Sequence, residues 1–349
     1  MNIAQESWGR TVEGEGITRF TLEAAGGVAV QLMSYGASLT SVRVPDRRGT
    51  VEEVTLGFDS LDGYLNPHPY FGSTLGRVAN RIARGRFTLD GKTCSLFCNN
   101  GKNHLHGGKK GFDRAAWASA AFQRDGQAGV LFMYESPDGE EGYPGVLNAR
   151  VTYVLSDAGV LDMIFEARAD AATIVNLSNH AYWNLKGDGR GDIRDHELTL
   201  FADRYLPVDS ELIPTGELRP VEGTPYDFRT PKSIGRDLEA AGGGYDNCYV
   251  LGDPADRGSE AGLRAVARVR EPSRGRGLEM WTTQPGVQLY SGHMLGPLAG
   301  RGGTYTKYGA FALETEGFPD AINQPAFPSV VLRPGGHMRE RTRIRFFAT

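Results

Sequence analysis

Apolar and polar residues alternate over many short stretches of this chain, and turn-forming residues separate the stretches. Residues 28–44 are rich in apolar and β-branched side chains, and Gly36 is a candidate bulge within them. Asp90 and Gly91 separate residues 87–89 from residues 95–97, and this dipeptide tolerates the positive φ of a hairpin turn. The pattern therefore predicts short strands joined by tight turns.

Asp157-Ala158-Gly159 is a second turn signal between two apolar stretches, and it predicts another hairpin. Helical patterns are short and occur at residues 61–65 and 237–241, while residues 253–258 have the composition of a surface turn. We therefore expect an all-β fold, one large, mostly antiparallel β domain over residues 1–349. The further strand-like stretches are residues 130–134, 151–155, 161–165, 263–269 and 341–347.

Composition limits the fold, the partners and the cellular setting that we expect. The 47 glycines and 18 prolines are scattered, which fits many tight turns better than a few long helices. The net charge of -4 argues against a nucleic-acid partner. The 3 cysteines, Cys94, Cys98 and Cys248, form no disulfide framework, and we expect buried or half-buried free thiols. With neither a signal peptide nor an apolar membrane-spanning segment apparent, we expect a reducing, cytoplasmic setting and no membrane partner.

The segment around His180 carries the first candidate chemistry. Ser178 and Asn179 precede this histidine, and Tyr182 and Trp183 follow it closely. Histidine can give and take protons near neutral pH, and aromatic rings offer a face on which a sugar ring can lie. The alternative interpretation is a polar loop with a histidine satisfied by hydrogen bonds.

Two more segments add polar groups. Asn80 and Arg81 offer an amide and a planar fork of donors that suits sugar hydroxyls, although they could also form a solvated edge. His104 and His106 should point to the same side of an extended segment. They could chelate a metal, with Cys94 and Cys98 as further candidate ligands nearby, or place one imidazole in a pocket and the other at its rim. No acidic third ligand follows at short range, which disfavours the metal.

Candidate carboxylates come from later strands. Asp246 follows a glycine run at residues 242–244, which indicates a site loop, and Gln288 lies on a strand-like stretch. Glu314 would share one strand face with Ala312. If that face is buried, the carboxyl group is costly to desolvate, and acid/base catalysis is one function that would explain it. If the face is exposed, Glu314 lies in solvent.

Taken together, these segments resemble the motif series of the galactose mutarotases, or aldose 1-epimerases, in that family's order. This resemblance implies a large antiparallel β-sandwich and an enzyme that interconverts the α and β anomers of an aldohexose such as galactose or glucose. It implies neither metal nor organic cofactor. The matching segments are Asn80-Arg81 and residues 105–108, 179–182, 244–246, 285–288 and 313–315, with residues 319–321 after them.

The resemblance also implies roles. Glu314 is the base and His180 the acid, and the chemistry needs Glu314 ionised while His180 is protonated. Glu316 lies close by, so the choice between the two glutamates rests on the family motif. The expected partner is a small monosaccharide, bound by a monomer or homodimer, and the sequence does not show which aldose is preferred. The residues implied to bind the sugar are Asn80, Arg81, His106, Tyr182, Asp246 and Gln288.

Two other functions fit parts of the pattern. A glycoside hydrolase would use two carboxylates, for which Glu314 and Asp246 are available. A sugar-binding module without activity would keep the fold and need no acid/base pair. The proposed pairing of His180 with Glu314 favours the mutarotase over both.

Overall fold

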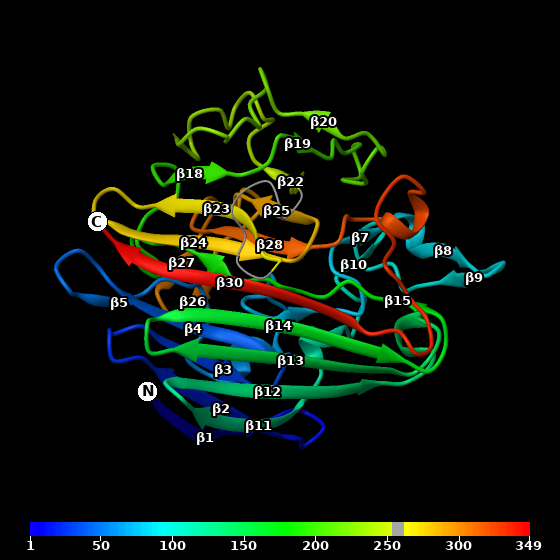
Figure 1. The fold of residues 1–349 in the computed structure, drawn as a ribbon, viewed down its shortest axis with the longest axis horizontal. Helices are drawn as coiled ribbons and strands as arrows, with labels where there is room; N and C mark the ends of the chain where they lie inside the picture. The colour runs from blue at the N-terminus through cyan, green and yellow to red at the C-terminus, as the bar shows by residue number, and fades with distance from the viewer. Residues whose placement is uncertain (253–261) are drawn as a thin grey trace.

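Strands dominate the computed structural model, which describes residues 1–252 and 262–349 (Figure 1). The surface turn predicted at residues 253–258 lies outside the described residues. Within the described residues α1 (Leu61–Leu65) is the single α-helix, and every pair of named strands is antiparallel. This confirms the predicted all-β, antiparallel fold. The 3₁₀ turns are η1 (Ala83–Gly85), η2 (Phe112–Arg114), η3 (Glu140–Gly142) and η5 (Ala321–Asn323).

The longest strands form a nine-stranded sheet that runs across the front of Figure 1. Its inward-facing residues alternate with exposed ones, as in β13, where every second residue is buried. In spatial order the sheet contains β11 (Ala118–Arg124), β12 (Gln127–Ser136), β13 (Leu147–Ser156), β14 (Val160–Ala169), β30 (Met338–Ala348), β24 (Arg276–Thr282), β23 (Arg264–Arg270), β18 (Glu197–Leu200) and β21 (Lys232–Ser233).

Two smaller sheets pack against this one. The five-stranded sheet is built from consecutive strands: β1 (Asn2–Arg10), β2 (Gly16–Glu23), β3 (Ala29–Met33), β4 (Ser38–Pro45) and β5 (Val51–Glu53). The six-stranded sheet contains, in order, β17 (Tyr182–Trp183), β28 (Phe311–Glu316), β25 (Gly286–Tyr290), β22 (Asp246–Val250), β19 (Arg204–Tyr205) and β20 (Arg219–Pro220). One apolar core joins all three sheets, with Val30, Val151 and Leu289 among its members. The layers therefore form a sandwich.

Five pairs of short strands in the described residues lie outside these three sheets, and one of them carries the site residue Arg81. They are β6 (Thr74–Leu75) with β16 (Ser178–Asn179), β7 (Arg81–Ile82) with β10 (His104–Leu105), β8 (Arg86–Leu89) with β9 (Lys92–Ser95), β15 (Thr173–Ile174) with β29 (Val331–Leu332), and β26 (Leu298–Gly300) with β27 (Gly303–Tyr305). Pairing over two residues fixes a segment at one point and leaves the flanking residues free to follow an irregular path. The side chains of those flanking residues can then be aimed at a common site.

Both predicted hairpin turns are present, but the second strand of the first hairpin is β9 (Lys92–Ser95) rather than residues 95–97. Asp90 and Gly91 adopt φ values of 49° and 77° between β8 and β9, which is the left-handed conformation that this turn requires. The strands β13 and β14 pair around the turn at residues 157–159. The strand-like stretches at residues 263–269 and 341–347 lie in β23 and β30.

The predicted strand at residues 28–44 is wrong as a single element, because β3 and β4 divide it. Gly36 lies in the connection between them at a φ of 67°, and a Cβ there would meet the Asp113 carbonyl oxygen at 2.6 Å. The register shift falls at Gln31 and Leu32 instead. The helix at residues 61–65 is confirmed as α1. Residues 237–241 form turns rather than a helix, because Gly242 and Gly243 continue the chain with positive φ.

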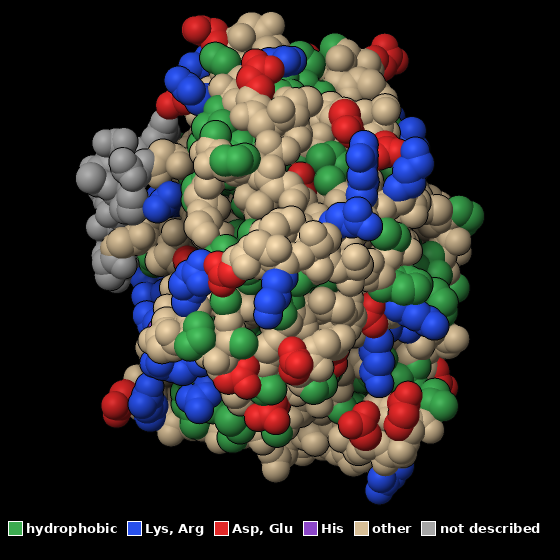
Figure 2. Space-filling model, turned by 90° about the vertical axis from the view of Figure 1, so that its right-hand side faces the viewer, with side chains coloured by type: hydrophobic (Ala, Val, Ile, Leu, Met, Phe, Trp, Pro, Cys, Tyr) green, Lys and Arg blue, Asp and Glu red, His purple; other side chains and the backbone are tan. Residues whose placement is uncertain are grey.

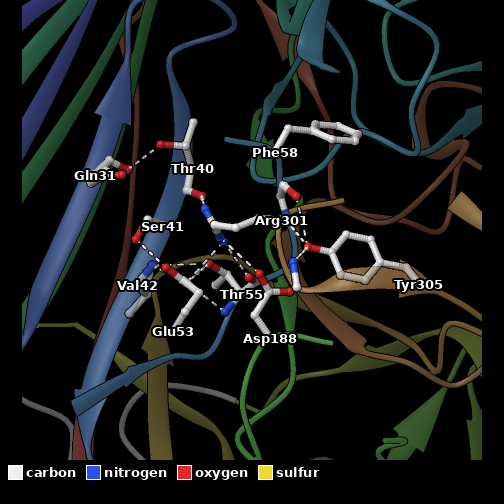
Figure 3. Close-up of polar contacts among 12 residues, drawn as sticks. Gln31, Thr40, Ser41, Val42, Glu53, Thr55, Phe58, Asp188, Arg301 and Tyr305 are labelled. Atoms are coloured by element: carbon white, nitrogen blue, oxygen red, sulfur yellow. Dashed lines mark hydrogen bonds and ion pairs between the residues drawn. The ribbon is translucent and has the colours of Figure 1, made fainter. Parts of the chain in front are cut away.

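A partly buried polar network fastens the turn between β26 and β27 to the five-stranded sheet (Figure 3). The Arg301 guanidinium donates to the carbonyl oxygens of Thr40 and Thr55 and to the Asp188 carboxylate, at 2.8–3.0 Å. Tyr305, on β27, donates its hydroxyl to the Gly57 carbonyl oxygen at 2.9 Å. Because charge-assisted hydrogen bonds are strong and directional, this network holds Tyr305 in one place.

Tyr305 begins a row of aromatic contacts that leads to the candidate site. Its ring lies 5.5 Å from that of Phe71, and the Phe71 ring lies 5.0 Å from that of Tyr182. Tyr182 in turn stacks on the His180 ring at 4.7 Å with the planes 10° apart. Packed rings hold one another in fixed orientations, so the network in Figure 3 supports the position of His180 from a distance.

The outer surface carries charges of both signs. Lys and Arg side chains are interspersed with Asp and Glu over the face that Figure 2 shows. The one α-helix of the described residues is far shorter than the apolar length that crosses a bilayer, and no described helix meets that requirement.

Candidate active site

Glu314 lies on β28, between β17 and β25 in the six-stranded sheet. Its neighbour on β25 is Gln288, which pairs with it directly in the register. On the other side of β28, Ala312 pairs with Tyr182. Glu314 is only 2% exposed, so the prediction of an inward-facing carboxyl is confirmed and the solvent-face alternative is wrong.

His180 faces this carboxyl from the irregular segment between β16 and β17. Its backbone N–H donates to the Ser73 carbonyl oxygen at 3.0 Å, and its own carbonyl oxygen accepts from Gly72 N–H at 2.9 Å. These bonds fix the backbone, and the ring of Tyr182 fixes the imidazole plane. The His180 Nε2 atom lies 3.5 Å from the Glu314 Oε1 atom. The two side chains are therefore close enough to exchange a proton in a single step.

His106 completes a cluster with these two residues. The ligand-type atoms of His106, His180 and Glu314 all lie within 4.8 Å of one another. The Asn80 backbone N–H donates to the His106 Nδ1 atom at 3.1 Å, so Nδ1 is an acceptor. A neutral imidazole has one donor and one acceptor nitrogen. His106 therefore presents Nε2–H toward the site as a hydrogen-bond donor.

His104 is not part of this cluster, and the prediction that it shares a side with His106 is wrong. Its Nδ1 atom lies 2.7 Å from the Phe97 carbonyl oxygen and its Nε2 atom 2.5 Å from the Tyr143 hydroxyl. The reason is local: β10 ends at Leu105, and His106 has a φ of 49°, so the extended alternation stops between the two histidines. His104 is a structural residue of the core.

The cysteines also lie apart from the cluster. Cys94 is half-buried and Cys248 buried, as expected, but Cys98 is exposed. All three are free thiols. The metal site imagined from Cys94 and Cys98 with His104 and His106 is not formed, because His104 and His106 face different surroundings.

The cluster of His106, His180 and Glu314 has the spacing of a three-ligand metal site, yet its hydrogen bonds fit a metal poorly. A ligating histidine normally donates its other ring N–H to an acceptor. Here His106 Nδ1 accepts an N–H, which leaves the proton on the nitrogen that would have to bind the ion. His180 Nδ1 has no hydrogen-bond partner among the described residues. This donor set suits hydrogen bonding to a sugar better than ligation.

We therefore expect chelators to leave the activity unchanged. The physical reason is the proton held on His106 Nε2, which a metal would have to displace. The rate of anomer interconversion is measured before and after extended treatment with EDTA and dialysis. A loss of rate that added zinc restores would contradict the prediction.

The remaining predicted residues line the polar side of the cluster. Arg81 Nη2 lies 3.8 Å from Asp246 Oδ2, and Gln288 Nε2 donates to Asp246 Oδ1 at 2.7 Å. Arg81 Nε also donates to the Asn100 side chain at 3.1 Å. Asn80 adopts a φ of 62° and directs its side-chain amide to Glu316, at 2.9 Å. The structure thus brings together all eight residues selected from the sequence.

Tyr70 is a site residue that sequence reasoning missed. Its ring lies 4.7 Å from the His106 ring, edge to face, and 6.1 Å from the His180 ring in a nearly parallel stack. Tyr70 has a φ of 59°, which is uncommon for a residue with a large side chain. That strain marks a place where the fold holds a side chain in an enforced position. The sequence gives no spacing or motif signal for it.

Burial dominates the electrostatics of the pair. It lowers the pKa of His180 to about 3 and raises the pKa of Glu314 well above its usual range, and the carboxyls of Glu316 and Asp246 raise the latter further. Burial also lowers the pKa of His106 well below its usual value, and the nearby His180 and Arg81 add to this. All three shifts favour neutral side chains. Burial therefore opposes the expected charge state, in which Glu314 is ionised and His180 is protonated.

Comparisons with known proteins show to which family this chain belongs. The aldose 1-epimerase family model matches residues 18–345. The chain belongs to the aldose 1-epimerase family. It is 49% identical to the galactose mutarotase of Bos taurus over 320 residues, which cover 91% of this chain and 90% of the relative. It is 38% identical to the aldose 1-epimerase of Escherichia coli K12, with 96% and 97% of the two chains covered.

Solved structures of aldose 1-epimerase relatives have the same fold. An aldose epimerase homologue from C. elegans superimposes with a TM-score of 0.85 at 30% identity, covering 94% of this chain and 98% of that one. The galactose 1-epimerase of Lactobacillus acidophilus gives a TM-score of 0.85 at 27% identity, with 99% of both chains covered. Family membership and the large antiparallel β-sandwich, both implied by the sequence motifs, are confirmed.

Proposed function

We propose that this chain is an aldose 1-epimerase, an isomerase that interconverts the α and β anomers of an aldohexose such as galactose or glucose. The observation that carries the proposal is the buried contact of 3.5 Å between His180 Nε2 and Glu314 Oε1, in a chain that belongs to this family. The curated relatives named galactose mutarotase and aldose 1-epimerase are matched over nearly their whole length.

The reaction needs one proton removed and another delivered. Glu314 takes the proton from the C1 hydroxyl, while His180 gives a proton to the ring oxygen as its bond to C1 breaks. The products of this step are the open-chain aldehyde, a protonated Glu314 and a neutral His180. Rotation about C1–C2 presents the other aldehyde face, and the same two transfers run backwards to close the ring. No atom is gained or lost, so neither metal nor organic cofactor is proposed.

The effect of burial fits this cycle. The neutral pair and the ion pair hold the same number of protons and differ only in which partner carries one of them. Burial favours the form in which Glu314 holds it, which is the state reached after ring opening. Substrate hydroxyls and the nearby Arg81 guanidinium stabilise the ion pair that starts the cycle. Because both side chains are buried, each transfer needs little reorganisation of solvent.

The other residues hold the sugar. Arg81 and Asp246 present donors and acceptors for vicinal hydroxyls, with Asn80 and Gln288 next to them. His106 donates Nε2–H on the side of C1 and the ring oxygen. Tyr182 is 3% exposed and stacks on His180, so we propose that it acts by holding the acid as well as by lining the site.

The glycoside hydrolase alternative fits the geometry less well. It needs two carboxyls on opposite sides of a glycosidic bond. Asp246 is already engaged by Arg81 and Gln288, while Glu314 faces a histidine. A sugar-binding module without activity would not need a buried acid/base pair.

Magnetisation transfer between the anomeric protons tests the function at equilibrium. With galactose or glucose at natural anomer ratios, the protein should transfer saturation from the α to the β anomeric proton. The spectrum should contain no new sugar. Transfer no faster than in buffer would contradict the proposal, and release of a reducing sugar from a glycoside supplied in a separate sample would favour the hydrolase. A panel of aldoses in the same assay would identify the preferred sugar.

We also propose that residues 1–349 act as one domain and that the protein works in the cytoplasm as a monomer or homodimer. A small monosaccharide is its proposed partner, without nucleic acid or membrane. The net charge of -4 and the mixed charges on the face shown in Figure 2 support this proposal for nucleic acid.

A further inference from the structure

Glu316 is a second buried carboxyl that the proposed cycle does not use. It lies two residues after Glu314 on β28, so both side chains project from the same face of the sheet, about 6.8 Å apart along the strand. Glu316 is 0% exposed. A carboxyl group without access to water is costly unless it is hydrogen-bonded, paired with a cation or protonated.

The contacts of Glu316 satisfy only one of its oxygens. Asn80 Nδ2 donates to Glu316 Oε1 at 2.9 Å. The Oε2 atoms of Glu316 and of Glu314 are both buried and have no hydrogen-bond partner among the described residues. The residue opposite Glu316 on β25 is Gly286, which brings no side chain to the pair. Each carboxyl therefore has room for a proton on Oε2.

The charges around the pair also favour a bound proton. Arg81 from β7 is the guanidinium that acts on both carboxyls, and it lies 3.8 Å from a third one, Asp246 on β22. The buried thiol of Cys248, also on β22, is close enough for both glutamates to raise its pKa. One cation thus faces three carboxyls. Burial raises the pKa of Glu316 to about 8, and the Asp246 carboxylate adds to this increase, while the Asn80 hydrogen bond and Arg81 act in the opposite direction.

We propose that Glu316 is a positioning residue whose charge is coupled to that of Glu314 on the same strand face, and that it keeps the catalytic proton in the site at alkaline pH. At neutral pH Glu316 is uncharged and accepts the Asn80 hydrogen bond. On the alkaline side it ionises, and its negative charge makes the proton shared by Glu314 and His180 harder to remove. The catalytic meaning of this pair rests on the proposed function.

Glutamine is the informative substitution because it imitates the protonated carboxyl. Its amide oxygen can accept the Asn80 hydrogen bond, which matters because the Asn80 backbone N–H fixes the His106 tautomer. Glu316→Gln should therefore keep kcat at neutral pH within about threefold and KM within about twofold of the wild type. It can no longer acquire a negative charge.

The pH profile of kcat/KM separates electrostatic coupling between Glu316 and the catalytic pair from a merely structural role. In Glu316→Gln the alkaline limb should move to lower pH by about one unit or more, while the acidic limb stays in place because Glu316 is neutral there in the wild type. Thr315→Ser, on the opposite face of the same strand, is the control and should move neither limb. An unmoved alkaline limb overturns the proposal. Equal shifts of both limbs also overturn it, since they would show a permanent charge.

A titration without substrate keeps the pair testable if the variant is inactive or the function is different. Carbon-13 NMR of protein labelled at the glutamate Cδ atoms should show the Glu314 and Glu316 signals titrating in coupled steps in the wild type. In Glu316→Gln the Glu314 signal should titrate in one step, at least about one unit below the upper wild-type step. In Glu314→Gln the Glu316 signal should likewise titrate in one step. This second variant tests the pair if Glu316→Gln does not fold. Identical titrations in wild type and variants would overturn the pairing whatever the reaction is.

Discussion

Replacing Glu314 with glutamine is expected to lower kcat by about a thousandfold while changing sugar affinity by less than about tenfold. The amide keeps the shape and hydrogen bonding of the carboxyl but cannot take the C1 hydroxyl proton, and a positioned acid or base contributes about 10² to 10⁴ in rate. Polarimetric initial rates give kcat, and isothermal titration with the sugar gives affinity.

A matched control isolates the effect of this position. Glu340→Gln makes the same change at a half-buried glutamate on β30 in the nine-stranded sheet, where the carboxylate hydrogen-bonds Thr283. Its kcat should stay close to the wild type. Retention of half the wild-type kcat by Glu314→Gln would show that the base is Glu316 or another group. The structure favours Glu314 because its carboxyl, at 3.5 Å, faces His180, whereas Glu316 is bonded to Asn80.

His180→Asn should remove the alkaline limb of the pH profile together with most of the rate. The active pair holds one proton: the acidic limb reports the addition of a second, and the alkaline limb reports loss of the one that is shared. Burial lowers the pKa of His180 and raises that of Glu314, so the limbs should be far apart, with a plateau around neutral pH. An amide nitrogen supplies no proton to the ring oxygen, so the group titrating on the alkaline side is lost. Profiles of kcat/KM between about pH 4 and 10 test this.

His106→Asn is the comparison that assigns the acid. His106 holds its proton on Nε2 and donates a hydrogen bond, so its loss should lower the rate and leave a profile with two limbs. An alkaline limb that survives in His180→Asn and disappears in His106→Asn would show that the roles of the two histidines are exchanged.

The sequence predicted those parts of the fold that depend on neighbours along the chain. Alternation in β13 and the Asp90-Gly91 turn follow from strand pleat and from φ preferences, which are local. The division of residues 28–44 and the separation of His104 from His106 depend on positive-φ residues, Gly36 and His106, set by contacts made elsewhere. An alternating pattern carries no signal for such interruptions.

The candidate site was likewise predictable only in part. The resemblance selected eight residues that the fold does bring together, because each lies in a segment with its own motif. The bond from Asn80 to Glu316 joins residues 236 positions apart, and the contact of Tyr70 with both histidines depends on an enforced backbone conformation. Burial, which sets the protonation of the pair, is a property of the packed layers. None of these features has a sequence signature.

Polarimetry of freshly dissolved α-D-galactose and α-D-glucose tests the central claim most directly. The wild-type protein should speed the change in optical rotation toward the same final value that the sugar reaches alone, and Glu314→Gln at equal concentration should add only about a thousandth of the wild-type acceleration to the buffer rate. A wild-type trace that follows the spontaneous rate for these sugars and for the other aldoses of the panel would contradict the account. A different final rotation would do so as well, because an enzyme that only interconverts anomers cannot change the equilibrium.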